Sequence, residues 1–171
     1  MKNLIIVNGT MGVGKTATCQ ELRYLLPNNV FLDGDWCWMM QPFLVNEETK
    51  TMAMDNITHM LNNFLKCSTL ENIIFCWVIH QTQILQQICE GIDTSLCTLH
   101  VFTLTCTPQE LTQRIMKDVE QGTREEQVLG KSLERLVLYE QMPTYKIDVS
   151  QISPQQSAQR ILDEFKARQY R

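Results

Sequence analysis

The sequence predicts an α/β domain built on a mostly parallel sheet, and three observations support this prediction. Short apolar runs typical of buried strands alternate along the chain with segments of helical periodicity. A glycine-rich pattern, G-x-x-x-x-G-K-T, lies directly between the first expected strand and the first expected helix. The 171 residues suit one domain, and no repeat, low-complexity segment or linker divides residues 1–171.

The first half of the chain predicts two strands and two helices. Residues 3–7 are continuously apolar, as in a strand buried on both faces. Residues 15–26 carry apolar side chains at helical spacing and end before a proline. Residues 30–33 predict the second strand. Asn46 is the expected N-cap of a helix that has two acids in its first turn and one apolar face as far as Leu65.

The second half repeats the alternation and contains one charged excursion. Residues 117–130 are polar and include glycines, so they predict a lid or, alternatively, a plain solvated loop. Ser153, followed by proline, is the expected N-cap of the last helix. We expect strands at 72–79, 97–106 and 146–149, and helices at 81–91, 108–116, about 131–142, and from 154 onward.

Composition excludes several classes of protein. The net charge of −4 argues against a general binder of nucleic acid or anionic membranes. Seven scattered cysteines without a C-x-x-C pair favour reduced thiols over a disulfide framework or a zinc site. No apolar run has the length of a signal peptide or a membrane span. We therefore expect a cytoplasmic domain without nucleic-acid or membrane partners, and its oligomeric state is open.

The segment GTMGVGKT at 9–16 is the strongest functional signal, and a chance match in such a chain is of order one per cent. Its glycines let the backbone turn so that N–H groups face phosphate oxygens. Lys15 can reach the β- and γ-phosphates, and the Thr16 hydroxyl can ligate Mg²⁺. The predicted nucleotide contacts are Gly9, Thr10, Met11, Gly12, Val13, Gly14, Lys15, Thr16 and Thr18.

Two acids, Asp33 and Asp35, stand where the second strand ends. Residues two apart in an extended strand share a face, so both carboxylates are expected together at the carboxyl edge of the sheet, where ligands bind. One carboxylate can hold Mg²⁺ through water, and the other can accept a proton from a substrate hydroxyl. The alternative is an ordinary Asp-Gly-Asp turn.

The glycine-rich loop followed by FLDGD resembles the small-molecule kinases of the nucleoside-monophosphate-kinase-like class. This class includes gluconate, shikimate and adenylylsulfate kinases and related antibiotic phosphotransferases, and the layout is also similar to tunicamycin-resistance proteins. The resemblance implies a three-layer P-loop fold with a five-stranded parallel sheet in the order 2-3-1-4-5, helices on both faces and a short lid. It also implies that Asp33 organises Mg²⁺ and that Asp35 contacts the substrate hydroxyl.

Three arginines match positions that carry functional arginines in this class. The resemblance implies that Arg114 stacks near adenine, that Arg124 in the lid stabilises the transferring phosphoryl group, and that Arg135 reaches phosphate or substrate. Fixed positive charge suits a phosphoryl transition state. Each arginine also has a simpler explanation in a surface pair, such as Glu110 with Arg114 at i,i+4 spacing.

The chain differs from this class in two places: at the end of the third expected strand and in the residues that follow the second. The third strand ends FCWVIH, without the acid or the Gly-Gly that relatives carry there. The residues after FLDGD are aromatic or apolar. They predict either an apolar wall beside the substrate or, as we favour for Met39 and Trp38, core packing. His80 can bind substrate or simply begin a helix. The candidate wall residues are Trp36, Trp38, Met39, Met40 and Trp77.

These observations predict an ATP- and Mg²⁺-dependent kinase acting on a hydroxyl of a small molecule. Lys15, Asp35, Arg124 and Arg135 are the expected catalytic residues, and Thr16 and Asp33 the expected metal ligands. The alternatives are a resistance or regulatory protein that binds nucleotide and a small ligand without turnover, and a nucleoside or nucleotide kinase. The sequence leaves the acceptor and the choice between ATP and GTP open.

Overall fold

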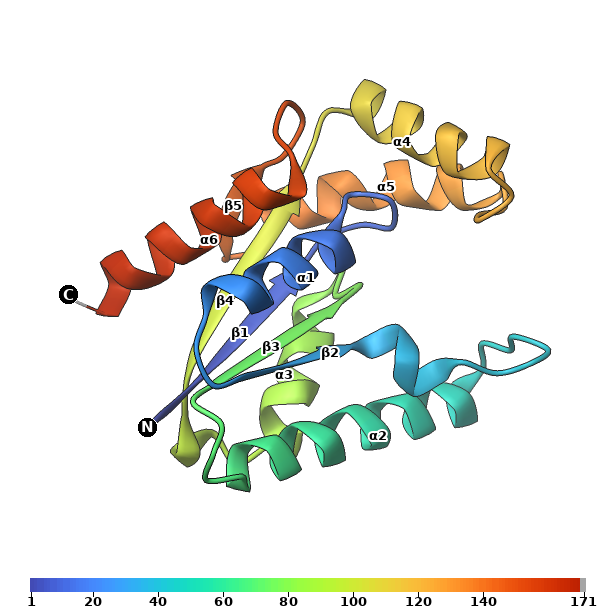
Figure 1. Ribbon diagram of the computed structural model, residues 1–171. Coiled ribbons are helices and arrows are strands. Elements are labelled where there is room, and N and C mark those ends of the chain that lie inside the picture. The colour runs from blue at the N-terminus through green and yellow to red at the C-terminus, as the bar shows by residue number, and fades with distance from the viewer. Residues whose placement is uncertain (170–171) are drawn as a thin grey trace.

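The computed structural model describes residues 1–169, which contain one five-stranded sheet in the order β2-β3-β1-β4-β5 (Figure 1). Each pair of neighbouring strands is parallel, as the sequence predicted. This order places the carboxyl ends of β1 and β2 on either side of the end of β3. The strands are β1 (Lys2–Asn8), β2 (Asn29–Asp33), β3 (Asn72–Trp77), β4 (Cys97–Thr105) and β5 (Tyr145–Asp148).

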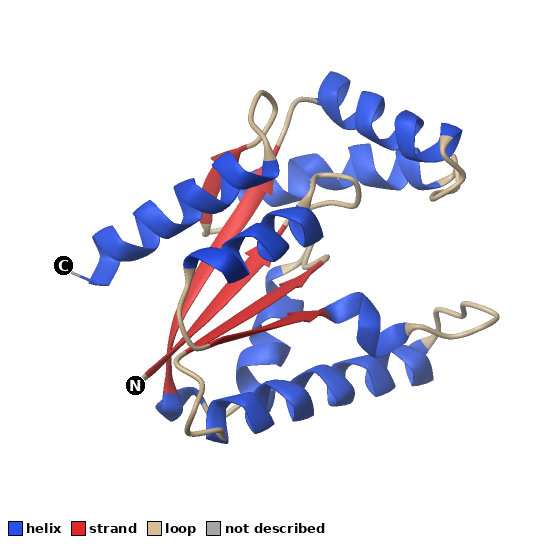
Figure 2. Cartoon of the chain, in the orientation of Figure 1, coloured by secondary structure: helices blue, strands red, loops and turns tan. Residues whose placement is uncertain are grey.

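Helices cover both faces of the sheet and complete the predicted three layers (Figure 2). The described part of the chain has no helix that is both long and apolar enough to cross a membrane. The α-helices are α1 (Lys15–Leu25), α2 (Glu47–Lys66), α3 (Thr82–Gly91), α4 (Pro108–Glu120), α5 (Val128–Gln141) and α6 (Pro154–Gln169), and the short 3₁₀ helices are η1 (Gly34–Trp38) and η2 (Thr94–Leu96).

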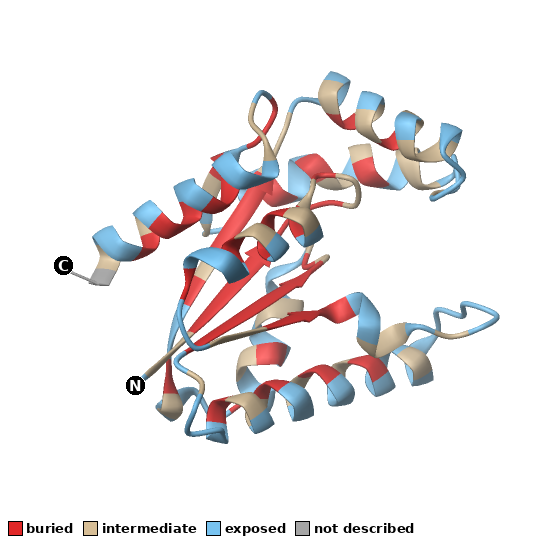
Figure 3. Cartoon of the chain, viewed as in Figure 1, coloured by how far each residue is buried: buried red, intermediate tan, exposed pale blue. Residues whose placement is uncertain are grey.

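The core lies on both sides of the sheet because alternate residues of a strand point to opposite faces. Ile5 and Val7 of β1 pack in the cluster that includes α1 and α6. Leu4 and Ile6 pack in the cluster that includes α2, α3 and α5. All four side chains are fully buried, and Figure 3 shows the central strands as buried along their length. The continuous apolar run of β1 follows from this burial on two faces.

The two predicted helix caps are present. The Asn46 side chain accepts a hydrogen bond from the Thr49 N–H (2.9 Å), and the Thr49 hydroxyl accepts one from the Asn46 N–H (3.0 Å), which makes a reciprocal cap for α2. At the start of α6, the Ser153 hydroxyl accepts a hydrogen bond from the Gln156 N–H (3.2 Å). Both caps satisfy N–H groups that the first helical turn leaves without partners.

The predicted lid is shorter than the polar stretch 117–130. α4 continues to Glu120, and α5 begins at Val128, so only 121–127 form the loop. The extra turns form because Val119 and Leu129 pack in the apolar cluster that joins α4 and α5. The two helices run side by side to the loop in Figure 1. The run of charged and polar residues therefore predicted a longer loop than the structure contains.

Candidate active site

The glycine-rich loop joins β1 to α1 in a conformation that suits an anion. Gly12 (φ 81°) and Gly14 (φ 104°) take left-handed backbone angles that side chains disfavour. The first hydrogen bond of α1 runs from the Thr18 N–H to the Gly14 carbonyl (3.0 Å). The N–H groups before Thr18 thus lie at the positive end of the helix, where phosphate binds.

Lys15 is buried beside this loop. Its ammonium donates a hydrogen bond to the Thr10 carbonyl (2.9 Å). Burial lowers the pKa of Lys15, and the negative charge of Asp35 and Asp33 opposes that shift. An ammonium has three N–H donors, so this carbonyl uses only one of them. The others are available to phosphate oxygens.

Thr16 and Asp33 bring two hard oxygen ligands together. The Thr16 hydroxyl donates a hydrogen bond to Oδ2 of Asp33 (2.6 Å). Within residues 1–169, no three His, Cys, Asp or Glu side chains are grouped so that they could hold a metal. This pair fits Mg²⁺, which proteins commonly bind through one or two oxygen ligands together with substrate phosphates. Thr16 and Asp33 are the residues that would hold such an ion.

Asp35 does not lie on an extended strand, so the prediction that it shares a strand face with Asp33 was wrong. β2 ends at Asp33, whose Oδ1 accepts a hydrogen bond from the Asp35 N–H (3.1 Å) and so caps η1. Asp35 stands in the first turn of that 3₁₀ helix. The two carboxylates nevertheless lie close enough to interact. Desolvation first, and then repulsion by Asp33, raise the pKa of Asp35, while Lys15 opposes the shift.

Gly34, between the two acids, is required by packing. A Cβ at this position would lie 2.5 Å from Cγ of Trp77, the last residue of β3. The indole therefore covers Gly34 directly, and no other residue type fits without displacing it. This contact fixes η1, and with it Asp35, against the end of β3.

A cleft of about 990 Å³ opens beside Asp35. One wall is formed by η1 and the loop that follows it, the end of β3 contributes to the base, and the lid loop and α5 form the facing wall. Figure 1 shows η1 with its loop, and α5 with the lid loop, projecting as two arms beyond the carboxyl edge of the sheet. The lining residues are Met11, Asp35, Trp38, Met39, Met40, Gln41, Phe43, Val45, Trp77, Val78, Glu125, Gln127, Val128, Lys131 and Arg135.

Trp38 is the centre of the aromatic wall. Its ring lies between Phe43 (centroids 5.5 Å apart) and Trp77 (6.3 Å). Trp38 is half-buried and combines core packing with a position in the cleft. Met39 is 81 % exposed, so core packing was the wrong prediction for this residue. The reason is that η1 ends at Trp38 and the chain turns outward from the core.

The wall candidate Trp36 and the possible substrate-binding residue His80 are not among the residues that line the cleft. Trp36 packs edge-on against Phe31 of β2 (centroids 5.2 Å apart). His80 is half-buried near the end of β3. Burial, and next the charge of Arg135, lower the pKa of His80, which favours a neutral imidazole. Arg135 of α5 and Trp77 at the end of β3 line the same cleft.

Arg114 joins three parts of the chain. Its guanidinium forms an ion pair with Glu110 (2.8 Å) and donates hydrogen bonds to the carbonyls of Val13 (3.0 Å) and Val149 (2.6 Å). The Glu110 pair was the simpler explanation offered for this arginine, and it is present. The backbone contacts also hold the glycine-rich loop against the loop that follows β5. The predicted stacking on adenine stays a prediction.

Arg124 lies in the lid loop but is not among the residues that line the cleft. It forms an ion pair with Asp118 (3.1 Å) at the end of α4. Its charge lowers the pKa of both Lys15 and Asp35, although it is a minor cause for each. The lid therefore carries one positive charge within electrostatic range of the site, and that charge is paired with Asp118.

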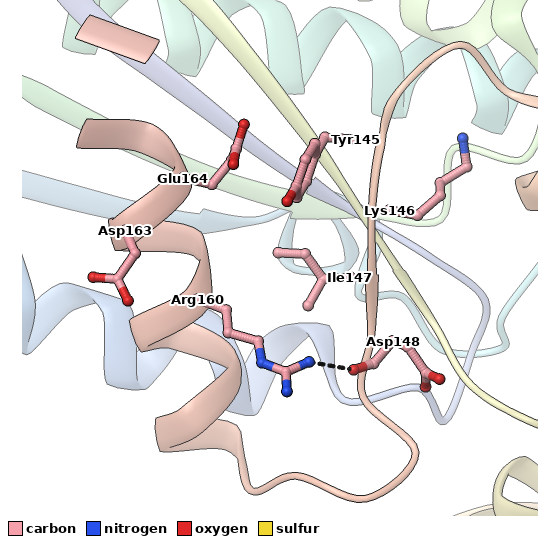
Figure 4. Close-up of a pocket in the computed structure, with 7 residues that line it drawn as sticks. All are labelled: Tyr145, Lys146, Ile147, Asp148, Arg160, Asp163 and Glu164. Atoms are coloured by element: carbon pink, nitrogen blue, oxygen red, sulfur yellow. Dashed lines mark hydrogen bonds between the residues drawn. The ribbon is translucent and has the colours of Figure 1, made fainter. Parts of the chain in front are cut away.

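A second hollow, of about 460 Å³, lies between β5 and α6 (Figure 4). Arg160 of α6 donates a hydrogen bond across it to the Asp148 carbonyl (3.2 Å). Its other lining residues are Tyr145, Lys146, Ile147, Asp163 and Glu164. None of the predicted site residues lines this hollow.

Several contributors to the site were not found from the sequence. Asn8 accepts hydrogen bonds from the N–H groups of Gly9 (2.8 Å) and Ile79 (2.9 Å), so it joins the ends of β1 and β3. Ser132 of α5 was also missed: its carbonyl accepts a hydrogen bond from the hydroxyl of Thr10, which was a predicted contact (2.9 Å). The Asn-Gly that ends the first apolar run was a usable signal for Asn8. The apolar Phe43-Leu44-Val45 in a proline-containing loop was a usable signal for the cleft wall.

The fold and the site together define a P-loop protein of the nucleoside-monophosphate-kinase-like class, which confirms the resemblance inferred from the sequence. The chain belongs to the AAA domain family, whose model matches residues 5–134. Among curated protein sequences, none is detectably related to the chain.

Solved structures with the same fold include three proteins that match nearly the whole chain. The tunicamycin resistance protein of Deinococcus radiodurans is 20 % identical with a TM-score of 0.69, and 96 % of each chain is covered. A gluconokinase of Sinorhizobium meliloti 1021 is 16 % identical with a TM-score of 0.69, covering 98 % of this chain and 95 % of that one. The shikimate kinase of Acinetobacter baumannii is 21 % identical with a TM-score of 0.68, covering 100 % and 97 %. At these identities the likeness concerns the fold.

Proposed function

We propose that the protein is an ATP- and Mg²⁺-dependent kinase that phosphorylates a hydroxyl of a small molecule. The observation that carries the proposal is the position of Asp35, which lines a cleft and interacts electrostatically with Lys15 of the glycine-rich loop. A carboxylate placed between a phosphate loop and an open cleft suits the activation of an acceptor hydroxyl.

In this mechanism the acceptor oxygen bonds to the γ-phosphorus while the bond from that phosphorus to the β–γ bridging oxygen breaks. ADP leaves, and the hydroxyl proton passes to Asp35. The loop N–H groups and Lys15 hold the phosphates, and Arg124 and Arg135 balance the charge of the transferred group. Mg²⁺, held by Thr16 and Asp33, would neutralise phosphate charge.

The decisive experiment is a screen of hydroxylated metabolites that follows ATP consumption and new phosphorylated masses. With an acceptor in hand, Asp35→Asn should lower turnover by roughly 10²–10⁴ while ATP affinity stays nearly unchanged, because only the proton acceptor is lost. Asp33→Asn should instead raise the Mg²⁺ concentration needed for activity. Asp163→Asn, in the hollow beside α6, is the matched control and should change neither.

Lys15→Ala tests nucleotide binding separately from turnover. Calorimetric titration with an ATP analogue and Mg²⁺ should show that tight binding is lost, and unchanged affinity would contradict the P-loop assignment. Binding that depends on Lys15, without phosphorylation of any acceptor, would favour a protein that binds nucleotide and ligand without turnover. Normal turnover by both Asp variants would refute the mechanism.

A further inference from the structure

The cleft beside Asp35 restricts what the acceptor can be, and this inference rests on the kinase function proposed above. Nine of the fifteen residues that line the cleft are apolar. Most of these lie in one segment, Trp38–Val45, and at the adjoining end of β3. A polyol bound against this wall would give up water from its hydroxyls and gain few hydrogen bonds in return. The wall therefore disfavours a purely polar acceptor.

The apolar wall is open to solvent. Met39, Phe43 and Val45 are 81 %, 63 % and 57 % exposed, and Figure 3 shows the loop after η1 as exposed. Covering such surface with an apolar ligand removes it from water, which favours binding. The rings of Phe43, Trp38 and Trp77 follow one another along the wall. Phe43 is the most exposed of the three and offers the largest aromatic surface to an aromatic or aliphatic body.

The facing wall is cationic. Lys131 and Arg135 stand four residues apart on α5, so their side chains share one face of the helix. Both line the cleft. Neither takes part in an ion pair within the described residues, whereas Arg114 and Arg124 do. One acid of the lid loop, Glu125, also lines the cleft. Lys131 is exposed, so an acidic group on the acceptor can reach its ammonium and form an ion pair with it.

We propose that the acceptor is a hydroxylated amphiphile with a carboxylate or a similar acidic group. Its aromatic or aliphatic body lies against the Trp38–Val45 wall, its acidic group faces Lys131, and its hydroxyl reaches Asp35. The charges also set the orientation, because Asp35 repels an acidic group from the catalytic end while Lys131 attracts it to the opposite wall.

Two fluorescent probes with related ring systems test the two walls without nucleotide. Anilinonaphthalenesulfonate carries an anionic group, and phenylnaphthylamine does not. Phe43→Gln should weaken binding of both probes by about tenfold, because apolar contact is lost. Val137→Gln, at an exposed position of α5 outside the cleft, should change neither. Equal binding to the parent and the Phe43 variant would overturn the proposed wall.

The same two probes test whether the charge of Lys131 attracts an anionic group. Lys131→Gln should weaken binding of the sulfonate by about three- to fivefold and leave the neutral probe unchanged, because only a solvent-exposed ion pair is removed. Lys166→Gln on α6 is the control for a general change in net charge and should alter neither titration. An equal effect of both lysine substitutions would refute a specific anion position.

Competition then separates this inference from the kinase function. Phenyllactate, which combines a ring, a hydroxyl and a carboxylate, should displace the sulfonate probe, and gluconate should not. Displacement by gluconate alone, or phosphorylation of gluconate by a protein that binds neither probe, would overturn the amphiphile inference and leave the kinase function standing. Probe binding with the expected variant pattern, but without ATP consumption in the metabolite screen, would refute the kinase function and leave the cleft inference standing.

Discussion

The substitution Gly34→Ala tests the packing between η1 and β3. It has two opposing effects on the stability of the fold. The backbone of Gly34 is outside the left-handed region, so alanine can adopt it. Removing a glycine from the unfolded chain should then stabilise the protein by about 0.4–1 kcal/mol. Against this, the new Cβ would lie 2.5 Å from Cγ and 2.6 Å from Cδ1 of Trp77.

The steric effect should dominate. Trp77 is only 9 % exposed and packs against Trp38 and the core, so its ring cannot move away freely. Overpacking of this kind costs about 1–3 kcal/mol. We expect a net loss of about 1–2 kcal/mol in the free energy of unfolding. For a domain of this size, each kcal/mol corresponds to a fall in Tm of roughly 2–4 °C.

Urea and thermal denaturation of matched variants check this expectation. Gly130→Ala in α5 is the control, because a Cβ there meets nothing within 4 Å. It should stabilise the protein by about 0.5–1 kcal/mol. Combining Gly34→Ala with Trp77→Ala removes the indole that clashes, so the cost of the alanine should largely disappear in that background. If Gly34→Ala alone raised stability as Gly130→Ala does, the indole could not lie over Gly34.

The site and its lid give three further predictions. Burial raises the pKa of Asp35 in the folded state, so ionisation opposes folding as pH rises above the ordinary value of 3.8, and the full penalty is reached above the raised pKa. Asp35→Asn should therefore melt higher than the parent at pH 7 and equally at pH 3, and a lower Tm at pH 7 would contradict this. Arg114→Leu loses charged hydrogen bonds to Val13 and Val149 and should cost about 2 kcal/mol in urea denaturation; an unchanged midpoint would show that these bonds contribute nothing. Amides of 121–127 should exchange rapidly in the free protein and slowly with an ATP analogue and acceptor bound, as a closing lid requires. Equal exchange in both states would make 121–127 a plain loop.

The sheet could be predicted from sequence because its signals are local. The apolar run of β1 is confined to one strand, and the glycine-rich loop leads directly into α1. The order of the strands came from the resemblance to a known class, and it is confirmed. Lys15, Thr16 and Asp33 could be placed for the same reason, because a strand end and a helix start define their positions.

Features that depend on distant contacts were predicted less well. The 3₁₀ turn at Gly34 is set by Trp77, which is far along the chain, and a rule for extended strands could not anticipate it. Met39 stands in an apolar stretch that resembles core, and nothing local indicates that the chain leaves the core after Trp38. The backbone partners of Arg114 lie 101 and 35 residues away in the sequence, so only the folded chain brings them together.

The hydrogen bond from Thr10 to the Ser132 carbonyl has a consequence for how this protein can evolve. It joins the glycine-rich loop to α5, the helix that also carries Lys131 and Arg135, so the groups that handle charge belong to one connected unit. Most of the apolar wall, by contrast, follows η1: residues 39–45 form a largely exposed loop outside the core, and only Trp38 of the wall segment packs against it. Exchange of this loop alone would give a lineage new acceptors while the phosphate-handling residues stayed in place, so acceptor preference should diverge faster in this family than nucleotide chemistry.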